Sequence, residues 1–111
     1  MGLNNMAMTL AAINQLEMAK TLVALEVNSS SQELRAWVAV YPKLQEKNIN
    51  YFEVRFFEIR KELVESNFSQ VDVLNSRNKK VETIKEVESI LSNWDVDSES
   101  LQVPWRCDYP L

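Results

Sequence analysis

Residues 48–66, NINYFEVRFFEIRKELVES, decide the fold, because they fit both a strand and a helix. Their aromatic and β-branched content favours a strand, and alternation groups Phe52, Val54 and Phe56 on one face. That alternation is lost at Phe57. A helical arrangement instead collects four apolar side chains on one narrow face, namely Phe52, Phe56, Ile59 and Leu63. We therefore predict a helix over 50–66, with a strand over 51–59 as the alternative.

The segments on either side of this stretch also carry helical patterns. Residues 31–47 place their large apolar side chains on one side of a helix, and Ser30 with Glu33 forms a capping-box pattern at its start. Pro42 predicts a kink or an early end, because proline removes a hydrogen bond inside a helix. Residues 78–94 give the clearest amphipathic helix of the chain.

Residues 4–27 predict a first helix with two apolar stripes. One stripe includes Met18, Leu22 and Leu25, and the other follows Ile13 and Leu16. A helix that is apolar on two flanks is buried on two flanks. It is either the central helix of a bundle or a contact with another chain, so Met18, Leu22 and Leu25 are candidate partner-binding residues.

Together these patterns predict an all-α fold. We expect a small antiparallel bundle of three to four helices in one domain, residues 1–111, with residues 95–111 as an extended C-terminal tail packed on it. The alternative is an α+β fold, in which the first and last segments stay helical and three segments form strands, namely TLVALEV, WVAVY and NYFEVRFF.

The chain ends in VPWRCDYPL, which joins two prolines to large apolar side chains. Proline favours extended backbone in itself and in the preceding residue. Trp105, Tyr109 and Leu111 are therefore predicted to seal the bundle or to dock on a partner. Cys107 is expected to be inert, because the chain has no histidine to activate it.

Composition argues against most catalytic chemistry. With no histidine and one cysteine, the chain lacks the imidazole and thiolate sets that catalytic triads and zinc sites use. Its single glycine, Gly2, excludes glycine-rich phosphate loops and disfavours tight hairpins. The carboxylates of EIRKELVE are expected to lie on a solvated helix face. We predict no catalytic residue, no cofactor and no metal.

Charge and hydropathy indicate which partners and which cellular compartment to expect. The net charge of −4 makes nucleic acid an unlikely partner, although Arg77, Lys79 and Lys80 form one basic cluster, expected at the start of the last helix. The sequence has no apolar run long enough for a membrane span and no basic N-terminal region of a signal peptide. We expect a cytoplasmic protein.

These observations predict a non-catalytic protein–protein interaction module, such as an adaptor, an assembly factor or a neutralising protein. We expect it to form a homo-oligomer, a homodimer in the simplest case, through the first helix. One alternative is a small-ligand binder or carboxylate-based enzyme with a pocket between helices. Another is a nucleic-acid accessory protein that uses the basic cluster.

Overall fold

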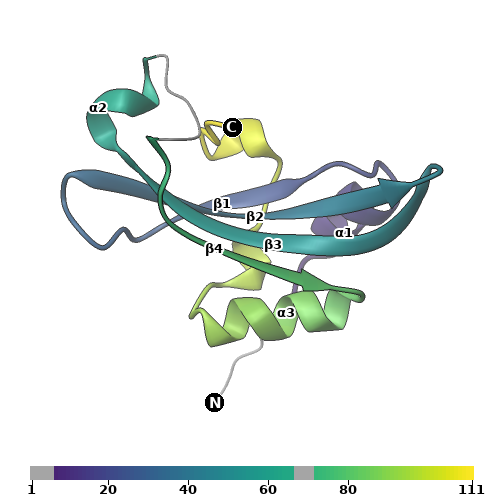
Figure 1. The fold of residues 1–111 in the computed structure, drawn as a ribbon. Coiled ribbons are helices and arrows are strands. Elements are labelled where there is room, and N and C mark those ends of the chain that lie inside the picture. Colours follow the sequence, from purple (N-terminus) through teal and green to yellow (C-terminus); the bar gives the residue numbers. More distant parts are fainter. Residues whose placement is uncertain (1–6, 67–71) are drawn as a thin grey trace.

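The computed structural model describes residues 7–66 and 72–111, and it is built around one antiparallel sheet (Figure 1). Four strands follow one another across this sheet in chain order: β1 (Val23–Val27), β2 (Leu34–Gln45), β3 (Asn48–Arg60) and β4 (Leu74–Val81). The helical elements within the described residues are α1 (Leu10–Glu17), α2 (Lys61–Val64), α3 (Ile84–Asn93), η2 (Ser98–Ser100) and η3 (Pro104–Arg106). The predicted all-α helical bundle is therefore wrong, and the fold is a sheet-dominated α+β fold.

The predicted helices over 31–47 and 50–66 are wrong for most of their length, because they contain the two long central strands, β2 and β3. Only Lys61–Val64 of the second segment is helical, as α2. Their hydrophobicity does not alternate because both faces of the sheet are covered at its centre, where five consecutive residues of β2 are buried. Pro42 is tolerated because β1 pairs only as far as Val23 opposite Val40. At Pro42 strand β2 is therefore a local edge, where no donor is needed on the β1 side.

The predicted first helix over 4–27 is also wrong for most of its length. Residues 4–6 lie outside the described residues, and α1 ends at Glu17. Lys20 then adopts a left-handed conformation with φ 59°, which turns the chain into β1. The last helix, predicted over 78–94, is present only from Ile84, because residues 74–81 form β4. Thr83 caps α3 in a capping box with Glu86.

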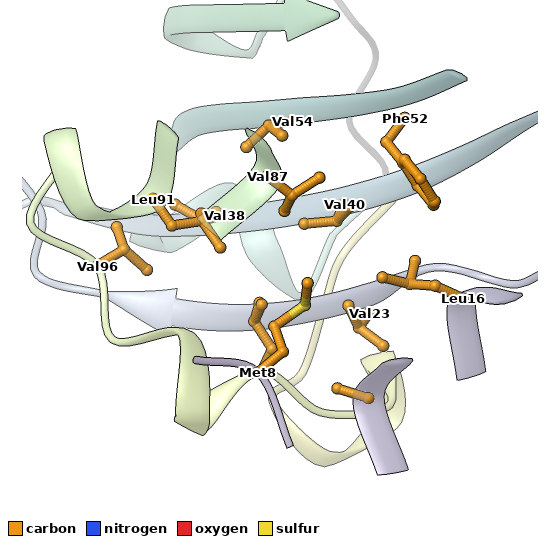
Figure 2. Close-up of a cluster of buried hydrophobic side chains, with 12 residues drawn as sticks. Met8, Leu16, Val23, Val38, Val40, Phe52, Val54, Val87, Leu91 and Val96 are labelled. Atoms are coloured by element: carbon orange, nitrogen blue, oxygen red, sulfur yellow. The ribbon is translucent and has the colours of Figure 1, made fainter. Parts of the chain in front are cut away.

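One face of the sheet is covered by α1 and α3 (Figures 1 and 2). Val87 and Leu91 of α3 are fully buried against Val38 and Val54 of the central strands, as Figure 2 shows. Leu16 of α1 is fully buried in the same cluster. This is the larger of the two apolar cores, and it fixes α3 against β3 and β4.

The opposite face is covered by the C-terminal tail. Trp37 and Phe57 are fully buried there and stack with ring centroids 5.9 Å apart. Cys107 and Tyr109 of the tail pack on them, and the Trp37 indole N–H donates to the Cys107 carbonyl at 2.8 Å. The hydroxyl groups of Tyr41 and Tyr109 also form a hydrogen bond. The tail is therefore part of the second core.

The hairpin between β2 and β3 forms without glycine. Glu46 and Lys47 occupy the turn with φ values of 53° and 72°, and Gln45 pairs with Asn48. Left-handed φ at both central positions is the geometry of a two-residue hairpin turn of the primed kind. A tight hairpin therefore forms here without glycine, because Glu46 and Lys47 both adopt the left-handed conformation despite its steric cost for residues with a side chain.

Candidate functional site

Strand β4 forms one edge of the sheet and is almost wholly exposed to solvent. It pairs with β3 from Phe52 opposite Val81 to Phe56 opposite Arg77. Seven of its eight residues are exposed, and only Val81 is partly covered. Within the described residues, no strand pairs with the outer side of β4. Its backbone is therefore accessible from that side.

The other edge of the sheet is different, because the C-terminal tail pairs with β1 at one point. The Ala24 N–H donates to the Gln102 carbonyl at 2.8 Å, and the Gln102 N–H donates back to the Ala24 carbonyl at 3.0 Å. This bridge blocks the middle of the β1 edge. Of the two edges, β4 is thus the one that offers an open run of main-chain donors and acceptors.

All charged side chains of β4 are positive. Arg77 and Lys79 lie on the face that carries α3, because they pair with Phe56 and Val54 of the first core. Lys80 lies on the opposite face, and its Nζ is 4.6 Å from the centroid of the Tyr51 ring. The sequence singled out these three residues but placed them at the start of a helix.

Arg77 is held in position by two aromatic rings. Its guanidinium carbon lies 4.4 Å from the centroid of Phe56 and 4.9 Å from that of Trp94. Such cation–π contacts fix the orientation of an arginine side chain. Within the described residues, the guanidinium makes no ion pair, so its N–H donors stay available.

Beside Arg77 the surface is hollowed into an open groove of about 1130 Å³. The end of α3 supplies one wall with Trp94 and Asp95, and β3 and β4 supply the floor with Glu58 and Asn75. The turn after β1 closes the third side. The groove therefore adjoins the same end of β4 that carries Arg77.

Glu58 is a buried carboxylate at the floor of this groove, with 1% of its surface exposed. It accepts hydrogen bonds from the Ser30 N–H at 2.6 Å, from the Ser30 hydroxyl at 2.9 Å, and from the Asn75 amide. Burial raises the pKa of Glu58, but these hydrogen bonds and the charge of Arg77 outweigh burial and lower it. Glu58 is therefore ionised and joins the β1–β2 turn to β4.

Replacing Glu58 by Gln is expected to lower the free energy of unfolding at neutral pH by about 1–3 kcal/mol, because one buried donor loses its acceptor. The pH dependence should change as well. Since the folded-state pKa lies below the ordinary value, the carboxylate stabilises the fold above that value, and this stability is lost as the pH falls through the folded-state pKa. Urea unfolding from about pH 7 to pH 3 should show this loss in the native chain and a flatter curve in E58Q.

Glu17→Gln is the matched control, because Glu17 is exposed at the end of α1. It should leave both the stability and its pH dependence unchanged. Parallel curves for E58Q and the native chain below about pH 5 would contradict the ionised, stabilising role of Glu58.

The candidate partner-binding residues read from the sequence do not come together. Met18 is 78% exposed beyond the end of α1, whereas Leu22 and Leu25 pack against opposite faces of the sheet. In the tail, Trp105 is 74% exposed and Leu111 is 41% exposed. Tyr109 is half-buried in the second core, with its ring centroid 5.7 Å from that of Phe57.

Sequence reasoning missed Glu58 and the role of Arg77. Glu58 was assigned to a solvated helix face, since neighbouring residues in EIRKELVE are also charged. The signal for β4 was the basic pair at alternate positions, Arg77 and Lys79, which share one face of a strand but not of a helix. The spacing can be read from the sequence, but it indicates a shared face only in a strand, and β4 was not predicted.

The described residues offer little material for metal or thiol chemistry. They contain no group of three or more His, Cys, Asp or Glu side chains that could hold a metal ion. Burial raises the pKa of the Cys107 thiol, which keeps it protonated. No helix within the described residues is long and apolar enough to cross a membrane. Comparisons of this chain with protein-family models, with curated proteins and with solved structures find no match.

Proposed function

We propose that this protein is a non-catalytic protein-interaction module that binds an extended segment of a partner protein along β4. The observation that carries the proposal is the exposed outer edge of β4. In an antiparallel sheet, alternate residues of an edge strand point their N–H and C=O groups away from the sheet. A partner strand can satisfy these groups by pairing with them, which is a common mode of peptide recognition.

The regular part of this edge is short and selective. Asn75, with φ 54°, lies in a bulge where the pairing of β3 with β4 shifts, so the even ladder runs from Arg77 to Val81. Lysines and bulges on an edge strand prevent indiscriminate pairing. The five residues of the even ladder, Arg77–Val81, remain for a partner of suitable sequence to pair with.

The proposed partner is a different protein rather than a second copy of this chain. Two β4 strands side by side would bring Arg77, Lys79 and Lys80 of one copy close to the same residues of the other, and like charges opposite each other destabilise strand pairing. Self-association through the first helix also loses its physical basis, because α1 ends at Glu17 and two long apolar stripes do not form. A homodimer is one outcome that a measurement of solution mass would detect.

The proposal that the protein is non-catalytic rests on the hydrogen bonding and the pKa of its buried carboxylate. Glu58 is the one acidic side chain buried among the described residues, and its hydrogen bonds fix it in place. A general acid or base needs a pKa near the working pH, and the pKa of Glu58 is shifted the other way. We keep the cytoplasm as the proposed compartment, since a single buried cysteine suits a reducing setting.

The proposal is tested by selecting linear peptides from a random displayed library on the full chain. Each selected peptide is then titrated into the ¹⁵N-labelled protein. We expect amide shifts and slower hydrogen exchange at Arg77–Val81, with cross-strand contacts between peptide and β4 backbones. The controls are two versions of the same peptide, N-methylated at the odd-numbered or at the even-numbered amides. Only one of these two sets of N–H groups faces β4 in a paired strand, so one version should lose binding and the other should keep it. Enriched peptides that shift only other residues, or no enrichment at all, would contradict the proposal.

A further inference from the structure

We infer that the segment that pairs with β4 is acidic, with carboxylates at alternate positions that bind Arg77 and Lys79. This inference rests on the proposed function and specifies the chemistry of the partner. Its basis is that two positive side chains, Arg77 and Lys79, lie two residues apart on one face of an open edge strand, and that Arg77 also lines the groove.

The spacing of these charges matches that of a paired strand. Residues two apart on a strand point to the same face and are separated by about 6.5–7 Å. A strand added beside β4 has the same repeat, so its side chains at alternate positions lie next to Arg77 and Lys79. Carboxylates at those positions meet both cations without any change in the backbone of β4.

Arg77 is prepared for this contact. Its place over Phe56 and Trp94 restricts the side chain before a ligand arrives, which lowers the entropy lost on binding. A guanidinium presents paired N–H donors that match a carboxylate, and among the described residues Glu58 forms no ion pair with Arg77 that would occupy them. The donors of Arg77 therefore remain for an external acceptor.

The negative charges of the groove limit where the partner carboxylate can lie. Glu58 and Asp95 both line the hollow, so its interior repels a second anion. The positive part of the site is Arg77, which lines the groove, together with Lys79, which lies two residues further along the same face of β4. The whole chain carries −4, so at long range it repels an acidic partner, and the selectivity arises from short-range contacts at β4.

The arrangement of the three cations favours a peptide over nucleic acid. Lys80 lies on the opposite face of β4 from Arg77 and Lys79, so the three do not form one flat basic patch. A phosphate backbone needs several cations on one surface. A strand that pairs with β4 has side chains on both faces and can meet all three.

The inference is tested with three synthetic peptides of eight residues that differ only at alternate positions, where they carry Glu, Gln or Lys. Each is titrated into the full chain at about 20 mM salt, with β4 amide shifts as the readout. Two exposed ion pairs, with Arg77 and Lys79, should make the Glu peptide about twofold to thirtyfold tighter than the Gln peptide. This advantage should shrink at about 200 mM salt, and the Lys peptide should not bind.

Variants locate the effect. Arg77→Gln and Lys79→Gln should each reduce binding of the Glu peptide severalfold and leave binding of the Gln peptide unchanged. Lys85→Gln is the control for net charge, because Lys85 is exposed on α3 and outside β4. If Arg77→Gln disturbs the packing of Phe56 and Trp94, which Arg77 covers, then Lys79→Gln still tests the charge contact by itself.

The outcomes separate the inference from the proposed function. Equal binding of the Glu and Gln peptides at β4 would overturn the acidic partner and leave strand addition in place. If neither these peptides nor any selected peptide shifts β4, strand addition itself is overturned. Displacement of the Glu peptide by an oligothymidylate at equal concentration would assign the cations to nucleic acid and overturn the inference.

Discussion

Removal of residues 104–111 is expected to lower the free energy of unfolding by about 4 kcal/mol or more, and to leave a chain that is largely unfolded at 37 °C. Trp37 and Phe57 have no exposed surface in the complete chain, and Cys107 and Tyr109 of the tail cover them. Without the tail, these two large side chains face water and the Trp37 N–H loses the Cys107 carbonyl. Urea unfolding followed by circular dichroism measures the loss.

A shorter deletion provides the control. Removing only Pro110 and Leu111 leaves Cys107 and Tyr109 in place, and Leu111 is already 41% exposed. This deletion should change the free energy of unfolding by less than about 1 kcal/mol. If the chain that ends at Val103 unfolds at the same urea concentration as the complete chain, the tail is not part of the core.

Replacing Trp37 by Ala should cost about 3–5 kcal/mol, the range found when large aromatic residues are removed from protein cores. Trp37 is fully buried, stacks on Phe57, and donates its indole N–H to the tail. The substitution therefore creates a cavity and leaves the Cys107 carbonyl without its donor. The midpoint of thermal unfolding should fall accordingly.

Trp105 gives the matched comparison, since it is a tryptophan of the tail itself and 74% of its surface is exposed. Trp105→Ala should change stability by no more than about 0.5 kcal/mol. Similar losses for the two variants would mean that Trp105 packs in solution, and would contradict the placement of the second core.

The sequence predicted α3 better than any other element. Its apolar residues repeat with helical spacing because only one side of α3 contacts the sheet, so Val87 and Leu91 stand out against charged neighbours. Strands β2 and β3 lack this contrast between apolar residues on one side and charged residues on the other. Trp37 faces the tail and Val38 faces α3, so successive residues are both apolar and the period of two disappears.

The alternative α+β prediction named the segments that form β1, β2 and β3, and the structure follows it there. It did not include β4, because LNSRNKKV contains no aromatic residue and few apolar ones. An edge strand with both faces exposed has little hydrophobic pattern to detect. The candidate site was missed for the same reason, since Arg77 and Glu58 become neighbours of one groove only when β4 pairs with β3.

The tail also sets an order in time for folding. The sheet pairs strands that are neighbours in the chain, whereas the contacts of the tail join residues about seventy positions apart, such as Trp37 and Cys107. Closing long loops costs more entropy than closing short ones, so distant contacts form late. The sheet is therefore expected to form first, with Trp37 and Phe57 still facing water. During that interval the molecule presents an aromatic surface to its neighbours, and the speed with which the tail docks determines how long it is at risk of aggregation.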